Sequence, residues 1–256
     1  MTTTVDPDEL ARFSALAAKW WDERGPMAPL HKFNPVRLAW IKGEICAHFS
    51  DPRRASPSSP PVRRDPKDAR ALAGLRILDV GCAAGLLTEP LSRMGAEVVG
   101  IDPSPQLIEA ARLHAAQMDL SIDYRATTAE ALAADGETFD VVMILEVVEH
   151  VTDVAAFVAT AASLVKPGGL LVASTINRTL KAFLLAIVGA EYVLRWLPRG
   201  THTYDKLVTP DELAAAFRAA GLTPAADTGV MYLPFFDEFR LTRDRDVNYM
   251  MTATRP

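Results

Sequence analysis

Apolar and polar positions change in a regular rhythm from residue 75 to the end of the chain. Runs rich in β-branched apolar residues predict strands, and apolar residues recur at helical spacing in the segments between them. The predicted strands include Arg76–Val80, Glu97–Ile101, Phe139–Leu145 and Gly169–Ser174, and the predicted helices include Pro105–Met118, Val154–Val165 and Asp211–Ala220. Near-continuous apolar strands joined by helices indicate a parallel sheet covered on both faces, which is the doubly wound α/β architecture.

Two further apolar runs, Thr228–Leu233 and Val247–Thr254, follow the last predicted helix. No helical segment separates them, so we expect them to close the sheet as an antiparallel, hairpin-like pair. The complete prediction is a mostly parallel, seven-stranded, Rossmann-like sheet.

The first 72 residues follow a different pattern. Apolar residues recur at helical spacing after the start signal Asp6-Pro7, whereas prolines make residues 21–41 an irregular cover that leads into a helix ending at about Phe49. The next stretch is rich in Pro, Ser and Arg and has few apolar residues, which predicts a flexible linker. The predicted division is a helical cover (1–50), a linker (51–72) and a main domain (73–256).

The composition excludes several classes of protein. Of 256 residues, 49% are hydrophobic and 23% are charged, and 27 basic against 32 acidic residues give a net charge of −5, which disfavours nucleic acid as a partner. The only two cysteines, Cys46 and Cys82, predict neither a disulfide framework nor a zinc site. The N-terminus has neither the apolar core of a signal peptide nor Arg-rich transit character, so we expect a cytoplasmic protein.

A glycine-containing loop follows the first predicted strand and precedes a helix. It reads Leu78-Asp79-Val80-Gly81-Cys82-Ala83-Ala84-Gly85, and Asp102 stands at the end of the second strand. Ligands of such sheets bind at this carboxyl edge, where an acid can accept hydrogen bonds from both hydroxyls of a ribose. A dinucleotide-binding fingerprint requires glycine at positions 81, 83 and 86, and Ala83 and Leu86 break it.

A carboxylate and imidazole cluster comes directly after Phe139–Leu145. If residues 146–150 form a helical turn, Glu146, Glu149 and His150 share one face beside the ligand crevice. Two carboxylates and one imidazole could hold Mg²⁺ with open positions for substrate oxygens. The alternative is a helix N-terminus that attracts acids, with His150 in a structural role.

Two levels of resemblance follow from these residues. The glycine loop resembles the D-x-G-x-G-x-G loop of class I S-adenosylmethionine-dependent methyltransferases, with Ala83 in place of the middle glycine. Further motifs resemble a narrower family, the ubiquinone biosynthesis O-methyltransferases, over nearly the whole chain except the linker. They are Trp20-Trp21-Asp22, Leu30 to Leu38, Glu146 to His150, Ser174 to Thr179, Gly189 to Tyr192, Pro198 to His202 and Asp246 to Met250.

The resemblance implies an enzyme that transfers a methyl group from S-adenosylmethionine to a hydroxyl of polyprenylated catechols, namely 2-polyprenyl-6-hydroxyphenol and 3-demethylubiquinol. The implied S-adenosylmethionine contacts are Arg37, Gly81, Asp102 and Leu145. A guanidinium at position 37 can pair with the methionine carboxylate. The implied magnesium ligands are Glu146, Glu149 and His150, of which Glu149 and His150 are also candidate catalytic bases.

One departure from the family is Ala83-Ala84, where relatives usually have Gly-Gly. A methyl group there would crowd the cofactor or require a backbone angle that alanine disfavours. This departure leaves open a noncatalytic lipid or quinone carrier that no longer binds the cofactor. A second alternative is a methyltransferase of the same fold that acts on another small phenol, which would not require a prenyl group on its substrate.

An insertion at about residues 176–208 combines large apolar residues with arginine and lysine. This mixture is typical of a helix that lies in a membrane interface, and a lid over the active site explains it equally well. Because a polyprenyl substrate resides in the membrane, we expect peripheral contact with the anionic inner face of the cytoplasmic membrane, with other ubiquinone-pathway enzymes as further candidate partners. His202, near the end of the insertion, is a reserve catalytic base.

Overall fold

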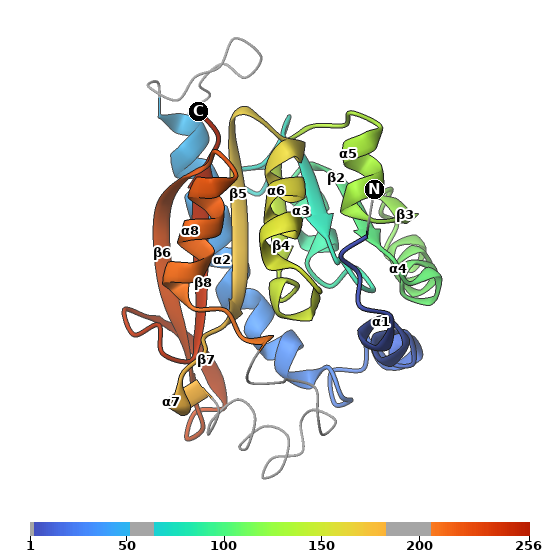
Figure 1. Ribbon diagram of the computed structural model, residues 1–256. Coiled ribbons are helices and arrows are strands. Elements are labelled where there is room, and N and C mark those ends of the chain that lie inside the picture. The colour runs from blue at the N-terminus through green and yellow to red at the C-terminus, as the bar shows by residue number, and fades with distance from the viewer. Residues whose placement is uncertain (1–2, 52–63, 183–205) are drawn as a thin grey trace.

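The computed structural model describes residues 3–51, 64–182 and 206–256. Within these ranges one eight-stranded sheet has the order β3-β2-β1-β4-β5-β8-β6-β7 (Figure 1). The strands are β1 (Arg76–Val80), β2 (Glu97–Asp102), β3 (Asp123–Ala126), β4 (Phe139–Leu145), β5 (Val165–Ile176), β6 (Thr223–Leu233), β7 (Glu238–Thr242) and β8 (Asn248–Thr254). Strands β1 to β5 pair in parallel, whereas β8 pairs antiparallel with β5 and β6, and β6 pairs antiparallel with β7.

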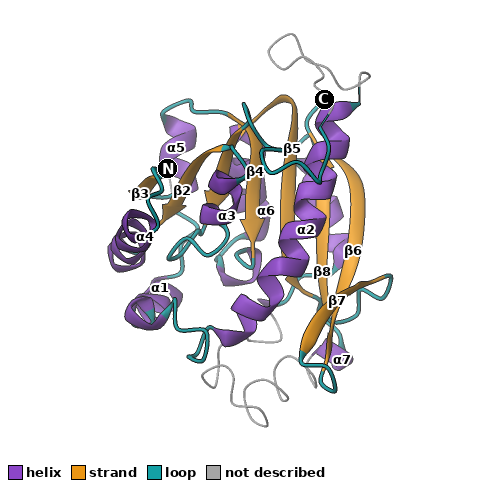
Figure 2. Cartoon of the chain, turned by 180° about the vertical axis from the view of Figure 1, so that it is seen from behind, coloured by secondary structure: helices purple, strands orange, loops and turns teal. Residues whose placement is uncertain are grey.

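Helices cover both faces of the sheet. They are α1 (Pro7–Ser14), α2 (Ala28–Ser50), α3 (Thr88–Arg93), α4 (Pro105–Gln117), α5 (Ala129–Ala134), α6 (Val154–Leu164), α7 (Leu180–Ala182) and α8 (Pro210–Ala219), with 3-10 turns η1 (Ala17–Lys19) and η3 (Val148–His150). Helices α5, α6 and α8 lie in front of the sheet in Figure 1, and Figure 2 shows α2 and α3 on the opposite face. Each face buries its own apolar cluster, and the buried β4 side chains contribute to both.

The predicted doubly wound sheet is confirmed, with one strand more than expected. The bounds of β1 and β4 coincide with the prediction, because both strands are mostly apolar and almost entirely buried in the sheet. The hairpin-like pair was wrong in one respect: β7 comes between β6 and β8 in the sequence. Its sequence, Glu238 to Thr242, alternates polar with apolar residues over only five positions, and it lies at the sheet edge, where no long buried run is required.

The prediction of an irregular cover over residues 21–41 was wrong from Ala28 onward. Helix α2 runs for 23 residues and contains Pro35 in its interior. Pro29 is tolerated in the first turn, where the backbone N–H has no helical partner. Apolar burial supports the rest of the helix, because Ile41 and Ile45 are fully buried against the sheet. Tertiary packing here outweighs the local effect of a proline.

Parts of the predicted linker and insertion fall outside the described residues. Residues 52–63 of the linker are among them, whereas its last residues, Ala71 and Leu72, are buried in the apolar cluster shared with α2. Arg64 donates from Nη1 to the carbonyl oxygens of Ala71 and Ala73, each at 2.9 Å, and so holds this end against the main domain. Residues 183–205, most of the predicted insertion together with His202, also lie outside the described ranges.

No helix among the described residues combines the length and the apolar character needed to span a bilayer.

Candidate active site

The four residues predicted to contact the cofactor line one cavity of about 760 Å³. Gly81, Asp102 and Leu145 stand at the carboxyl ends of β1, β2 and β4, and Arg37 reaches the same space from α2. Carboxyl ends of neighbouring parallel strands meet at one edge of the sheet, which is where open α/β folds bind ligands. The topology therefore brings together side chains that are up to about a hundred residues apart in sequence.

Gly81 allows the chain to turn sharply out of β1. Its φ is +72°, and a Cβ atom at this position would lie 2.6 Å from Cγ2 of Val147. The N–H groups of Gly81 and Cys82 both donate to the carbonyl of Ile101, at 2.8 and 3.0 Å, which ties the loop to β2. Only glycine satisfies both the left-handed angle and the close approach.

Asp102 is buried at the end of β2 and organises two backbone segments. Its Oδ2 accepts from the N–H of Ala83 at 3.1 Å, and its Oδ1 accepts from the N–H of Ser104 at 2.8 Å. Burial raises the pKa of Asp102 to about 6. Each oxygen keeps acceptor capacity on the cavity side, which suits a pair of ribose hydroxyls.

Arg37 is a buried cation with unused donors. Its Nε donates to Oδ1 of Asn34 at 2.9 Å, and its guanidinium lies 5.3 Å from the ring centre of Phe33. Burial lowers the pKa of Arg37, against the opposing effect of the Glu146 and Asp79 charges. Within the described residues its two Nη groups have no hydrogen-bond or ion-pair partner, although the side chain lines the cavity. A planar fork in this position fits a carboxylate.

The Ala83-Ala84 departure has two different structural consequences. Ala83 adopts φ +47°, the left-handed angle that alanine disfavours, and it lines the cavity. Ala84 is fully buried outside the cavity lining, in a cluster with Trp20, Met27 and Leu107. The expected backbone cost is confirmed at Ala83, whereas the methyl group of Ala84 packs under the N-terminal cover.

The N-terminal cover is fastened to the sheet by residues that sequence reasoning missed. Glu130, interpreted as an ordinary acid at a helix start, is buried and accepts from the N–H and Oγ1 of Thr4, at 2.8 and 2.6 Å. The ring of Trp21 stacks on His114 at 3.4 Å and donates from Nε1 to the carbonyl of Ala84. No local sequence signal marks these contacts, because each one joins segments more than 60 residues apart.

The predicted helical turn at residues 146–150 was wrong, and with it the expected convergence of three side chains. Glu146 has φ +54°, and helical structure begins only at Val148. Glu146 Oε1 accepts from Ser174 Oγ at 2.6 Å, and Glu149 Oε2 accepts from Thr175 Oγ1 at 2.8 Å. The remaining member, His150, lies beside Glu9.

His150 is paired with the N-terminal cover. Its Nδ1 lies 3.1 Å from Oε2 of Glu9, an α1 residue whose carboxylate is also 3.8 Å from Lys206 Nζ. Both Glu146 and His150 line the cavity, whereas Glu149 is not part of its lining. Glu9 is a further site residue that sequence reasoning missed, because its pattern is that of any acid in the first turn of a helix.

The three predicted magnesium ligands do not fit a single shared ion in this arrangement. Burial, and then the charge of Glu146, raises the pKa of Glu149 well above its ordinary range, which disfavours the charged form that binds a metal ion. Its buried Oε1 has no hydrogen-bond partner in the described part of the chain. Across residues 3–51, 64–182 and 206–256, no group of three or more His, Cys, Asp or Glu residues is placed to hold a metal ion.

Comparison with known proteins decides the family. A methyltransferase-domain family model matches residues 46–226. The ubiquinone biosynthesis O-methyltransferase of Brucella ovis is 57% identical over 254 residues, which cover 99% of this chain and 97% of the relative. The namesake from Chelativorans sp. is 56% identical, covering 99% and 95%. This chain belongs to the ubiquinone biosynthesis O-methyltransferase family.

Solved structures support the fold of the methyltransferase. Magnesium protoporphyrin IX methyltransferase from Synechocystis with bound S-adenosylmethionine matches with a TM-score of 0.60 and 15% identity over 100% of both chains. The same enzyme with bound S-adenosylhomocysteine gives 0.54 and 23% over 72% of this chain and 76% of the other. The predicted class I methyltransferase fold is thereby confirmed.

Proposed function

We propose that the methyltransferase transfers the methyl group of S-adenosylmethionine to a hydroxyl of polyprenylated catechols, namely 2-polyprenyl-6-hydroxyphenol and 3-demethylubiquinol. The substrate class follows from the ubiquinone biosynthesis O-methyltransferases that this chain resembles and from the family motifs. The observation that carries the proposal is that Arg37, Asp102 and Leu145 line one cavity, whose lining also includes His150 and a set of apolar side chains from α2, β6 and β7. A charged cofactor and an apolar substrate can therefore meet inside one space.

We assign the cofactor's polar groups to the residues with matching donors and acceptors. The two Nη groups of Arg37 would hold the methionine carboxylate, and the Asp102 carboxylate would accept from both ribose hydroxyls. Gly81 lets the backbone approach the cofactor, and the side chain of Leu145 would pack against it at the end of β4. Because these groups are held by α2, β1, β2 and β4, they position the sulfonium before the acceptor arrives.

Methyl transfer from a sulfonium is an in-line displacement. The phenolic oxygen forms a bond to the methyl carbon as the carbon–sulfur bond breaks, and the hydroxyl proton must leave the oxygen. We assign this proton to Nε2 of His150, since Glu9 beside Nδ1 favours the tautomer that carries its proton on Nδ1. The products are the methyl ether and S-adenosylhomocysteine. Glu149 does not line the cavity, so it would influence methyl transfer only indirectly, through the charge and position of Glu146.

Magnesium and the membrane stay predictions beside this scheme. No step above uses a metal ion, because the predicted ligands Glu146, Glu149 and His150 do not converge. We propose peripheral contact with an anionic membrane and association with other ubiquinone-pathway enzymes on the cytoplasmic side, because the substrate's polyprenyl chain belongs in a bilayer. The insertion predicted to make that contact lies mostly outside the described residues.

The deciding experiment measures transfer of a labelled methyl group from S-adenosylmethionine to a catechol with a single prenyl unit. It is run with Mg²⁺, with EDTA, and with His150→Ala and Glu9→Gln variants. Transfer that survives EDTA and falls in both variants supports the scheme. Transfer that EDTA abolishes would return Glu146, Glu149 and His150 to the role of metal ligands. No transfer, with cofactor binding also absent by calorimetry, would favour the noncatalytic carrier.

A further inference from the structure

The cavity has a second region, beyond the residues assigned to the cofactor. There helix α2 and strands β6 and β7 form an almost entirely apolar wall. Its lining residues are Pro29, Leu30, Phe33, Val230, Met231, Tyr232, Pro234 and Phe239. None of these side chains carries a charge, and Tyr232 alone has a polar side-chain atom. Neither a sulfonium cofactor nor a catechol ring requires so much apolar surface.

Packing holds this wall in place. Phe33 on α2 and Phe239 on β7 lie 5.3 Å apart between ring centres, and Tyr232 lies 5.1 Å from Phe239. Phe33 and Val230 are buried in one cluster with Met250 of β8. The wall therefore exists before any ligand binds, and a ligand that covers it loses little conformational freedom.

The same hairpin leads from the cavity to an exposed apolar tip. Strand β6 ends at Leu233, β7 begins at Glu238, and between them Phe235 is 100% exposed and Phe236 is 68% exposed. Asp237 holds the turn, since its carboxylate accepts from Lys32 Nζ at 2.6 Å and from Tyr232 Oη at 2.6 Å. Lys32 reaches this turn from α2, and β7, which follows the turn, lies beside α7 in Figure 1.

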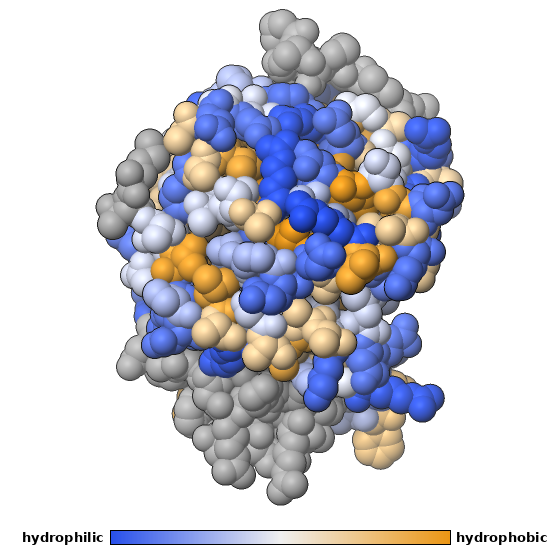
Figure 3. Space-filling view, turned by 90° about the vertical axis from the view of Figure 1, so that its right-hand side faces the viewer, coloured by the Kyte–Doolittle hydropathy of each residue, from blue (hydrophilic) through white to orange (hydrophobic). Residues whose placement is uncertain are grey.

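Phe235 and Phe236 form an exposed aromatic pair on this anchored turn, and only Phe236 has a neighbouring cation among the described residues, Arg240 at 5.5 Å from its ring centre. The face that carries α4 and α5 offers a contrast, because it is largely hydrophilic with scattered apolar side chains (Figure 3). Single exposed apolar residues, such as Leu113 on α4, are ordinary on protein surfaces. Two adjacent aromatic rings at the end of an apolar cavity wall mark a binding surface.

We propose that the wall formed by α2 and the β6–β7 hairpin is the binding site for the polyprenyl tail, and that the tail leaves the protein past Phe235 and Phe236. This inference rests on the proposed function, because it names where the tail of that substrate lies. A tail on this wall would extend from the catechol beside His150 to the tip of the hairpin. Apolar area removed from water would make longer tails bind more tightly until the wall is covered.

The test compares two catechols, one with a single prenyl unit and one with a hexaprenyl tail in detergent. Met231 lines the cavity and is 41% exposed, so Met231→Asp places a charge against the tail with little risk to folding. Met118, 44% exposed at the end of α4, supplies a matched control, Met118→Asp. We expect Met231→Asp to raise the KM of the hexaprenyl catechol about tenfold and to leave the KM of the single-prenyl catechol unchanged.

Several outcomes decide the proposal. An unchanged ratio of the two KM values in Met231→Asp overturns it, and so does an equal change in Met118→Asp. If Met231→Asp melts early, Leu30→Ala removes apolar contact from the opposite side of the wall and must lower the preference for the long tail. If wild type methylates neither catechol, the proposed function fails. Displacement of a fluorescent farnesyl probe by hexaprenol, weakened by Met231→Asp, still tests the tail site on its own.

The hairpin tip has a separate test. With the hexaprenyl catechol in phosphatidylcholine vesicles, we expect Phe235→Ser combined with Phe236→Ser to raise its KM about tenfold. The single-prenyl substrate in solution should show no change, and Leu113→Ser serves as the control for loss of an exposed apolar side chain. Equal KM values for the double variant and wild type in vesicles would overturn the exit at the tip.

Discussion

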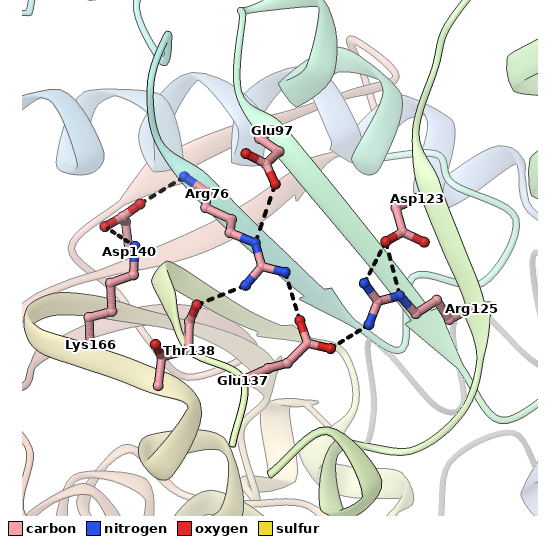
Figure 4. A network of polar contacts seen from close by, with 8 residues as sticks. All are labelled: Arg76, Glu97, Asp123, Arg125, Glu137, Thr138, Asp140 and Lys166. Carbon is pink, nitrogen blue, oxygen red and sulfur yellow. Dashed lines mark hydrogen bonds and ion pairs between the residues drawn. The ribbon is translucent and has the colours of Figure 1, made fainter. Parts of the chain in front are cut away.

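The two ends of the parallel strands use acidic residues in opposite ways. At the carboxyl end, Asp79 and Asp102 are buried, and burial raises the pKa of each to about 6. At the amino end, Glu137 accepts from Arg76 and Arg125 in the network of Figure 4, and the hydrogen bond from Arg76 is the main factor that lowers its pKa. One sheet thus contains acids whose ionised form is disfavoured by burial and acids whose ionised form is stabilised by arginine.

The acids at the two ends of the strands are suited to different roles, ligand binding at the carboxyl end and stability of the fold at the amino end. Within the described residues, Asp79 and Asp102 have no ion pair within 4 Å, and their hydrogen bonds come from a hydroxyl and from backbone N–H groups. A ligand can supply the missing partners. The acids of the amino end already have arginine or lysine partners, as Asp140 has in Lys166 at 2.9 Å. We therefore expect changes at the carboxyl end to alter cofactor affinity and changes at the amino end to alter stability.

The largest effect is expected from Asp102→Asn. The amide keeps the shape of the side chain and loses the charge that strengthens hydrogen bonds from the ribose, so the Kd for S-adenosylhomocysteine should rise about 100-fold in calorimetry. Glu97→Gln is the control, because this acid begins the same strand with a side chain 74% exposed. An affinity within about threefold of wild type for Asp102→Asn would contradict the assignment.

Cofactor binding should also depend on pH. Because the ionised form of Asp102 accepts both ribose hydroxyls, protonation below about pH 6 should weaken binding up to about tenfold per pH unit. The stability of the protein without cofactor should change in the opposite sense. The pKa of Asp79 and of Asp102 is about 6 in the folded state, above the unfolded value of about 3.9. Each acid therefore lowers the free energy of unfolding as the pH rises from the unfolded pKa to the folded pKa. Calorimetry from pH 5 to 8 checks the binding, and a flat profile would contradict it.

A smaller effect is expected at the strained loop residue. Ala83→Gly removes the cost of φ +47° and should raise the free energy of unfolding by about 1 kcal/mol, measured by thermal denaturation. Gly81→Ala should do the opposite, because it places a Cβ atom 2.6 Å from Val147 at φ +72°. A less stable Ala83→Gly variant would mean that the alanine methyl contributes more through packing than its backbone angle costs.

The smallest effect is expected at the amino end. Glu137→Gln weakens the hydrogen bonds from Arg76 and Arg125 and should lower the free energy of unfolding by about 0.5 kcal/mol with no change in cofactor affinity.

The lowered pKa of Glu137 gives a second check of this prediction. Its contribution is present above the unfolded pKa of about 4.3 and is lost as the pH falls below it. In denaturant titrations, the loss of stability between pH 7 and pH 3.5 should therefore be smaller for the variant than for wild type. Glu238→Gln, in an exposed pair with Arg240, is the matched control.

The sequence predicts the site residues at the carboxyl ends of the parallel strands better than it predicts the segments that surround them. Gly81, Asp102 and Leu145 could be placed because each ends a strand whose apolar run is unmistakable, and parallel strands share that edge. Helix α2 was partly missed, because its stability comes from contacts with the sheet rather than from its own prolines and apolar spacing. Long-range packing of this kind leaves no local pattern.

The Glu146 cluster shows the same limit at the scale of one residue. Helical spacing would have brought Glu146 toward His150, and a single left-handed residue at 146 is enough to separate them. The partners that orient the two side chains, Ser174 and Glu9, lie on β5 and α1. Both are remote in sequence, so neither could be identified before the fold was known.

The fastening of the N-terminal cover has a practical consequence for handling the enzyme. Thr4 lines the cavity, accepts from the N–H of Thr152 at 3.0 Å and is held by Glu130, so an affinity tag fused ahead of it would emerge beside the cofactor. Arg255 pairs through its backbone with Gly168 and Gly169, near the amino end of β5 and thus at the opposite edge of the sheet. Tags, fluorophores and surface-attachment handles therefore belong after Pro256.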